Sequence, residues 1–188
     1  MHYRIVLASQ SPRRRMLLED LGINFTVRTK DIEEDFPSNL LPTEVAEFLA
    51  KKKSTAYKTT IAADELIITA DTLVALENEI LNKPESSEHA TQMLQKLSGK
   101  THQVITGVAL LSTSKSEVFS VISKVTFAKL SADEIEKYVS SKSPMDKAGS
   151  YGIQDWIGKI AVTKIEGSYE NIVGLPTQEL YRRLKPFL

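Results

Sequence analysis

The 188-residue sequence contains no cysteine. Disulfide scaffolds, cysteine-ligated zinc sites and thiol-based catalysis are therefore excluded. Charge of either sign is not in excess, because 24 Lys and Arg residues balance 24 Asp and Glu residues. Dedicated nucleic-acid binders and proteins of anionic membrane surfaces carry a basic excess. We therefore expect neither nucleic acid nor membrane as a partner.

Long apolar segments are missing as well. No stretch approaches the roughly 18 residues that a membrane helix needs. The first residues, Met1 to Ala8, are too short an apolar region for a signal peptide, so we expect a cytoplasmic protein. With 41% hydrophobic and 26% charged residues, the composition is typical of a globular chain, which we predict to be one domain over residues 1–188.

The apolar patterns predict an α/β protein. Strands are expected at residues 5–8, 25–28, 66–76, 104–111, 118–130 and 160–165. Helices are expected from Pro12 onward and at residues 43–57, 86–97, 131–139 and 177–184. Strands and helices alternate early, and two long strands then follow each other. This order predicts a mixed sheet.

The segment from Ser9 to Arg15 is the first candidate site. It joins a predicted strand to a helix that opens with Ser11 as cap and Pro12 as first residue. Free backbone N–H groups, the positive helix end and adjacent guanidinium groups together suit an anion such as phosphate. A capped surface helix with solvated arginines explains the same residues.

Asp71 and Thr72 form the second candidate site. They interrupt a strongly apolar predicted strand, and a buried carboxylate needs a cation, a metal or a place at a strand end that faces a cleft. Ligands of open α/β sheets gather at the carboxyl ends of strands, which favours a cleft. A buried hydrogen bond to neighbouring backbone is the structural alternative for either residue.

Lysines supply the third candidate set. Lys53 lies on a predicted helix, and Lys83 follows the turn after the Asp71 strand, where a hairpin would return it toward that carboxylate. Most lysines are solvated surface residues, and Lys51–Lys53 alone would be interpreted in that way. The spacing does not decide between these two interpretations.

The segment from Pro144 to Gln154 is the fourth candidate. Two glycines and several small residues without periodicity predict tight turns, where backbone can approach a ligand. The amide of Gln154 carries both a donor and an acceptor, so it can contact the edge of a nucleobase or cap a turn.

Other nucleotide and metal sites find no support. The sequence has no GxxxxGK[ST] loop and no GxGxxG after the first strand, and its three histidines lack metal-ligand spacing. The acidic run that contains Glu34 is typical of a solvated loop. Beside a magnesium-dependent anion site, it would supply a hard oxygen ligand.

Taken together, the sequence resembles the Maf family of nucleoside triphosphate pyrophosphatases. Five segments in order carry the resemblance: Leu7–Arg14, Ala70–Val74, Leu97–Val108, Asp146–Gln154 and Gly167–Pro176. The match extends nearly from end to end. One departure is Asn82-Lys83-Pro84, where the family often has Gly-Lys-Pro; the lysine is retained.

The resemblance implies both a reaction and a fold. The family hydrolyses the α–β phosphoanhydride of nucleoside triphosphates to a monophosphate and pyrophosphate, with a divalent metal such as Mg²⁺ or Mn²⁺. The implied fold is an elongated α/β structure with a twisted mixed sheet flanked by helices. It has a cleft between two lobes, similar to the inosine triphosphate pyrophosphatases. A homodimer is expected from the resemblance alone.

The resemblance also assigns residues. Asp71 is expected to accept a proton from water and Glu34 to assist at the metal; for both, the sequence leaves open a base or a metal-ligand role. Expected phosphate contacts are Ser9, Arg14, Lys53 and Lys83. The positions that separate substrate subgroups are Arg13, Thr72 and Gln154. This combination is similar to the dTTP/UTP branch, which also accepts some modified uridine nucleotides.

Two alternatives to a dTTP/UTP pyrophosphatase that cleans the nucleotide pool stay open at this point. The family is also associated with arrest of septum formation and cell division, so a nucleotide-binding regulator is one alternative. An enzyme of the same fold with preference for m7GTP or a purine nucleotide is the other.

Overall fold

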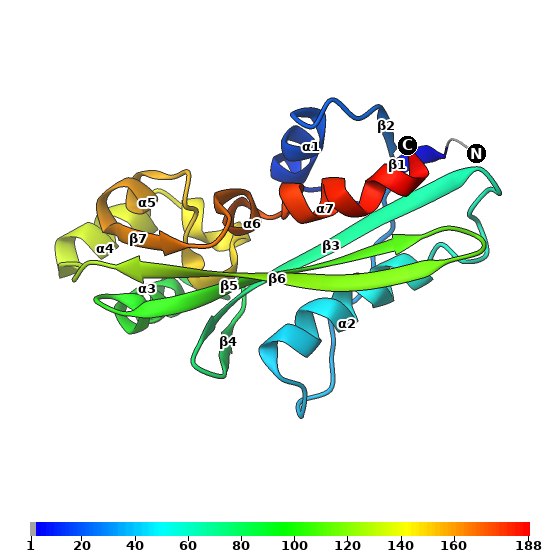
Figure 1. Ribbon diagram of the computed structural model, residues 1–188. Coiled ribbons are helices and arrows are strands. Elements are labelled where there is room, and N and C mark those ends of the chain that lie inside the picture. The colour runs from blue at the N-terminus through cyan, green and yellow to red at the C-terminus, as the bar shows by residue number, and fades with distance from the viewer. Residues whose placement is uncertain (1–2) are drawn as a thin grey trace. The chain divides into compact units, whose positions relative to one another are not determined.

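The computed structural model describes residues 3–188, which form an α/β fold on a seven-stranded mixed sheet (Figure 1). The strand order is β2-β1-β3-β5-β6-β7, and β4 pairs with β3 outside this path. The strands are β1 Arg4–Leu7, β2 Phe25–Val27, β3 Glu65–Leu76, β4 Glu79–Leu81, β5 Thr101–Leu111, β6 Ser116–Phe127 and β7 Val162–Glu166. The helices are α1 Pro12–Glu19, α2 Pro42–Thr55, α3 Ser87–Leu97, α4 Ala132–Ser140, α5 Trp156–Ala161, α6 Tyr169–Val173 and α7 Thr177–Leu184. Short 3₁₀ turns occur at Ser143–Asp146, Ala148–Ser150 and Lys185–Phe187.

The chain divides into two compact units. The first comprises the chain up to Thr72 together with residues 106–121 and 174–188, and the second comprises residues 73–105 and 122–173. Strands β3, β5 and β6 pass from one unit into the other along the chain. Of the helices within residues 3–188, none is both long and apolar enough to cross a bilayer.

Three parallel strands organise the first unit. β1 pairs with β2 in the register Ile5↔Phe25 and with β3 in the register Leu7↔Ile68. The side chains of Val6, Leu7 and Ile68 are completely buried. A parallel sheet that is covered on both faces requires such continuous apolar runs rather than alternation, which explains the composition of these strands.

Helices cover both faces of the first unit's sheet. Figure 1 shows α1 and α7 on one side of β1 and β3, and α2 on the other side. α2 approaches β5 closely at Gly107, where a Cβ atom would lie 2.2 Å from the carbonyl oxygen of Ala46. Glycine is therefore required at this position for α2 to pack on the sheet. On the same face, the Thr69 hydroxyl donates to the Ala50 carbonyl at 2.7 Å.

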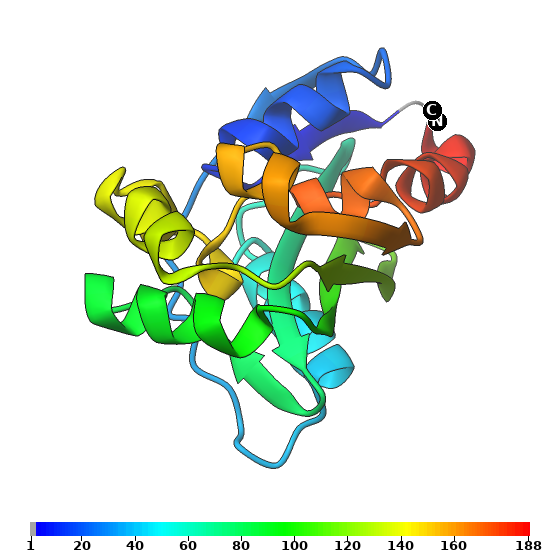
Figure 2. The same cartoon turned by 90° about the vertical axis from the view of Figure 1, so that its left-hand side faces the viewer.

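The start of β1 lies beside the end of the chain (Figure 2). The amide of Tyr3 donates to the Phe187 carbonyl at 3.2 Å, and the two rings meet edge to face at 5.5 Å between centroids. α7 and the turn that follows it are thereby joined to the parallel strands.

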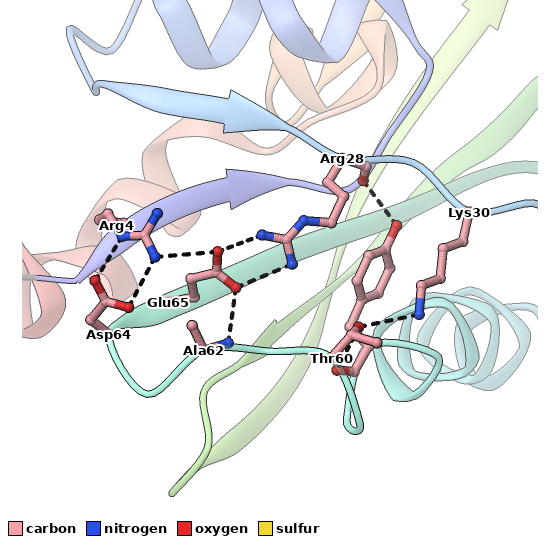
Figure 3. Close-up of polar contacts among 8 residues, drawn as sticks. Arg4, Arg28, Lys30, Thr60, Ala62, Asp64 and Glu65 are labelled. Carbon is pink, nitrogen blue, oxygen red and sulfur yellow. Dashed lines mark hydrogen bonds and ion pairs between the residues drawn. The ribbon is translucent and has the colours of Figure 1, made fainter.

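A buried carboxylate, Glu65, lies at the start of β3 (Figure 3). Its two oxygens accept hydrogen bonds from the guanidinium of Arg28, and one of them also accepts from the Ala62 amide at 3.0 Å. Arg4 lies 3.6 Å from Glu65 and makes a two-pronged contact with Asp64. Hydrogen bonding to Arg28 holds the pKa of Glu65 below its usual value. These charged residues together link the ends of β1, β2 and β3.

We expect the Glu65→Gln substitution to lower the free energy of unfolding by about 1–3 kcal/mol at pH 7, because a charge-assisted hydrogen bond to Arg28 is lost. A carboxylate whose pKa is lowered on folding stabilises the protein above its unfolded pKa of about 4.3 and loses that effect at lower pH. The difference between parent and variant is therefore expected to shrink as the pH falls below about 4. Urea unfolding at several pH values measures this difference in the free energy of unfolding. The control is Glu136→Gln, because Glu136 is exposed. A difference that is as large at pH 3 as at pH 7 would contradict this account.

The second unit combines antiparallel strand pairs with helices. The end of β3 forms a hairpin with β4 in the register Val74↔Leu81, and β6 pairs with β7 in the register Val125↔Ile165. Helix α3 packs against α4. Three buried rings meet edge to face, and they belong to His102, Phe127 and Tyr151.

Most elements expected from the sequence are confirmed, but the strand predicted over residues 160–165 begins too early. Residues 156–161 form α5, and β7 starts only at Val162. Ile157 and Ala161 are buried one helical turn apart, and a Cβ at Gly158 would lie 2.1 Å from the Ile153 carbonyl oxygen. The alternation from Ile160 onward fits a strand equally well, so packing decides where the helix ends.

Candidate active site

β3 extends beyond the end of its parallel neighbour β1. β1 ends at Leu7, which is opposite Ile68, and the amide of Ala8 donates to the Ile68 carbonyl at 2.8 Å. β3 then continues to Leu76, so Asp71 lies in the middle of this strand, past the carboxyl end of β1. A strand end that faces a cleft is one place that the sequence predicts for Asp71. The structure shows a buried mid-strand position, past the point where β1 pairs with β3.

The chain that leaves β1 turns into α1 through Ser9, Gln10 and Ser11. Ser11 is the cap: its hydroxyl accepts from the Arg14 amide at 3.4 Å, and Pro12 is the first helical residue, as predicted. The Ser9 hydroxyl accepts from the Ser11 amide at 3.2 Å. This turn brings two hydroxyl groups and the positive end of α1 to the carboxyl end of β1, which is the arrangement that binds anions.

The guanidinium of Arg14 is held by three neutral oxygens. Its Nε donates to the Gly174 carbonyl at 2.9 Å, its Nη2 to the Thr72 hydroxyl at 3.1 Å and its Nη1 to the Ser9 hydroxyl at 3.4 Å. Burial lowers the pKa of Arg14, and the charge of Asp71 partly opposes this effect. Arginine has five N–H donors, so the fork retains donors for an anion.

Thr72 is part of a hydroxyl pair that supports Arg14. Its hydroxyl lies 2.9 Å from the Thr106 hydroxyl on β5, and it is 3.4 Å from the Gly174 carbonyl. Thr106 and Gly174 were not predicted as site residues from the sequence, although both lie within the family segments. A threonine within the apolar run of β5 was the available signal, since a fully buried hydroxyl needs a partner.

Asp71 and Glu34 share one cation, the ammonium of Lys53. Lys53 Nζ donates to Asp71 Oδ1 at 2.5 Å and to Glu34 Oε1 at 2.8 Å. The Asp71 and Lys53 side chains are only 11% and 17% exposed, whereas that of Glu34 is 48% exposed. Lys53 on α2 therefore connects the acidic loop to the centre of β3. The neighbouring Lys52 pairs with Asp35 instead.

Lys53 and Arg14 contact opposite faces of β3, because successive side chains of a strand point to alternate faces of the sheet. Asp71 meets Lys53 on the α2 face, and Thr72 meets Arg14 on the α1 face. The pairing of β3 with β1 ends at Ile68, before Asp71 and Thr72. β3 thus carries a guanidinium on one face and a carboxylate–ammonium pair on the other.

The carboxylates of Asp71 and Glu34 suit a divalent cation that binds together with a phosphate ligand. Within residues 3–188, no group of three or more His, Cys, Asp or Glu side chains has the arrangement of a metal site. Mg²⁺ is usually held by one or two carboxylates, with phosphate oxygens and water completing its shell. Asp71 and Glu34 already flank one cation position, which the Lys53 ammonium fills. The pair fits this mode of metal binding.

The other predicted residues lie around α1 and in the second unit. Arg13 is half-buried on α1, and its charge contributes to the lowered pKa of Arg14. Lys83 follows β4 and lines a cavity of about 160 Å³ together with His89. Gln154 is exposed in the turn before α5. Participation of Lys83 and Gln154 in one site with Asp71 stays a prediction.

The family model described as Maf-like protein matches residues 4–187. The chain belongs to this family. A relative of this Maf-like chain in Phocaeicola vulgatus, named dTTP/UTP pyrophosphatase, is 53% identical over 184 residues, which cover 97% of this chain and 95% of the relative. Relatives with the same name in Bacteroides thetaiotaomicron and Flavobacterium psychrophilum are both 49% identical; the alignments cover 97% and 95% of this chain, and 95% and 91% of the relatives.

Solved structures confirm the fold of this Maf-like chain. A nucleoside-triphosphatase (dITP/XTP pyrophosphatase) from Mycobacterium abscessus superposes with a TM-score of 0.50 and 13% identity, over 97% of this chain and 93% of that one. A HAM1 protein from Coxiella burnetii superposes with a TM-score of 0.50 and 15% identity, over 98% and 99%. The expected similarity to this fold is thereby confirmed.

Proposed function

We propose that this Maf-like chain hydrolyses dTTP and UTP to the monophosphate and pyrophosphate, and thereby clears these nucleotides and some modified uridine triphosphates from the cytoplasmic pool. The observation that carries the proposal is the pair of groups on either side of β3: Arg14 held by neutral oxygens and Asp71 paired with Lys53. The names of the relatives support the same substrates. Residues 1–188 are one pyrophosphatase domain, which acts as a homodimer.

The triphosphate is bound by cations and hydroxyl groups. Arg14 offers the remaining donors of its planar fork, and the Ser9 hydroxyl lies beside it. Lys53 and Lys83 add ammonium groups for the other phosphates. The chain as a whole is uncharged, so these local cations supply the attraction for a multiply anionic substrate.

Asp71 accepts the proton of the attacking water. Lys53 donates a 2.5 Å hydrogen bond to this carboxylate and thereby fixes its position for accepting the proton. Glu34 shares the same ammonium and assists from the exposed loop. A divalent cation, Mg²⁺ or Mn²⁺, held by Asp71 and Glu34 would offset the charge of the phosphates.

Base selection falls to Arg13, Thr72 and Gln154. The amide of Gln154 can pair with the donor–acceptor edge of uracil or thymine. Unlike Gln154, Thr72 acts indirectly, because its hydroxyl is already hydrogen-bonded to Arg14 and Thr106. It therefore influences substrate choice through the placement of the Arg14 fork.

Hydrolysis rates for dTTP, UTP, CTP, GTP, m7GTP and ITP, each with Mg²⁺ and with Mn²⁺, test the proposal. We expect dTTP and UTP to have the highest kcat/KM and pyrophosphate to be the product. A highest value for GTP, m7GTP or ITP would contradict the pyrimidine preference. Tight UTP binding without pyrophosphate release would favour a nucleotide-binding regulator instead.

A further inference from the structure

The turn that carries Gln154 is anchored on both sides of this residue. Tyr151 and Ile153 before it are buried, whereas Gln154 itself is exposed. The Asp155 amide donates to the Gly152 carbonyl at 3.0 Å and closes the turn. A single exposed amide therefore projects from a backbone segment whose neighbours are fixed.

Tyr151 fixes the first side of this turn. Its hydroxyl shares a 2.7 Å hydrogen bond with His102 Nε2 on β5, and its ring packs edge to face on those of His102 and Phe127. Burial lowers the pKa of His102 to about 4, so the imidazole is neutral at pH 7. The preceding Ser150 is also buried, and its hydroxyl contacts the Met93 sulfur at 3.0 Å.

Tyr138 on α4 fixes the other side. Its hydroxyl donates to Asp155 Oδ2 at 2.6 Å and accepts from the Gly152 amide at 3.1 Å. One phenol group thus contacts both ends of the turn that contains Gln154. Burial raises the pKa of Tyr138, so this hydroxyl keeps the proton that it donates.

We propose that Tyr138 and Tyr151 are positioning residues that hold the Gln154 amide for recognition of the uracil or thymine edge. This inference rests on the proposed function, because it takes Gln154 as the group that reads the base. An amide on a fixed turn loses less conformational freedom on binding than one on a mobile loop. The backbone position from which the amide extends also stays constant, which disfavours an alternative pairing with a base of a different edge.

The Tyr138→Phe and Tyr151→Phe substitutions test this inference, since each removes one hydroxyl and retains the ring. We expect the preference for UTP over CTP, as a ratio of kcat/KM, to fall by about 3–10-fold with each, which is the effect of one hydrogen bond. The change is expected in KM for UTP, with kcat within about twofold of the parent. Tyr57→Phe is the matched control, because Tyr57 is buried and its hydroxyl donates to the Arg28 carbonyl at 2.9 Å.

Two further measurements separate positioning from a general loss of stability. In a Gln154→Ala background, Tyr138→Phe is expected to leave the UTP/CTP ratio unchanged, because residues that act through one another are not additive. Hydrogen exchange of the amides of residues 151–155 is expected to accelerate in both tyrosine variants and to stay at the parent rate in Tyr57→Phe.

The outcomes are distinct. Unchanged exchange in both tyrosine variants, or an equal fall in the ratio with and without Gln154, would overturn the inference. A parent protein without preference for UTP over CTP would contradict the proposed function, and the inference about base recognition with it. In that case accelerated exchange would show that the anchoring is real, which identifies the proposed function as the part that failed.

Discussion

Replacement of Asp71 by Asn is expected to reduce turnover of UTP by on the order of 10²–10⁴, the range for loss of a general base. Asn has the same shape but cannot take a proton from water. Because Lys53 also contacts Glu34, the ammonium keeps one carboxylate partner in the variant. We therefore expect the fold and the affinity for a non-hydrolysable UTP analogue to be retained.

Steady-state kinetics and calorimetric binding of the analogue measure these two quantities separately. Asp133→Asn is a suitable control, since Asp133 is exposed on α4. A variant with parental turnover would show that Asp71 is not the proton acceptor. A fall well beyond about 10⁴, with loss of metal-dependent binding of the analogue, would favour a metal-holding role for Asp71 over that of a base.

Replacement of Arg14 by Lys is expected to reduce kcat/KM by about 10–100-fold. Lysine keeps the positive charge but lacks the planar fork, so it cannot contact Gly174, Thr72 and a phosphate at once. Charge-assisted hydrogen bonds contribute about 1.5–3 kcal/mol each, which corresponds to this range. Both KM and kcat are expected to change, because misplaced phosphates also misplace the reacting atom.

Arg15→Lys is the matched control, because Arg15 follows on the same helix and is exposed. Its kcat/KM is expected to stay within about twofold of the parent, since an exposed arginine on α1 has no fixed geometry to lose. A kcat/KM of Arg14→Lys that also stays within about twofold of the parent would show that Arg14 acts through its charge alone, because lysine retains that charge. The geometry of its three neutral partners would then have no role in substrate binding.

Local pattern was sufficient to predict most elements of the fold. The cap formed by Ser11 and Pro12 and the capping box of Ser131 and Glu134 depend on neighbours within four residues, so the sequence predicts them directly. The β3 strand was predicted from its apolar run in the same way. Asp71 was recognisable because a carboxylate in such a run needs a partner.

The identity of that partner was decided by the tertiary structure. Lys51, Lys52 and Lys53 are equivalent in sequence, but each turns by about 100° around α2 relative to the one before. Only the packing of α2 on the sheet, which Gly107 permits, determines that Lys53 is the one that reaches Asp71. The same holds for Thr106, which meets Thr72 through the pairing of distant strands.

Local periodicity was sufficient to predict the α/β class, and the resemblance of five motif segments indicated the family and the types of residue in the candidate site. The structure alone decided which lysine pairs with Asp71, where α5 ends and that Arg14 is held by neutral oxygens. These features depend on contacts between segments far apart in the chain. No local pattern encodes them, since they arise only when the helices dock on the sheet.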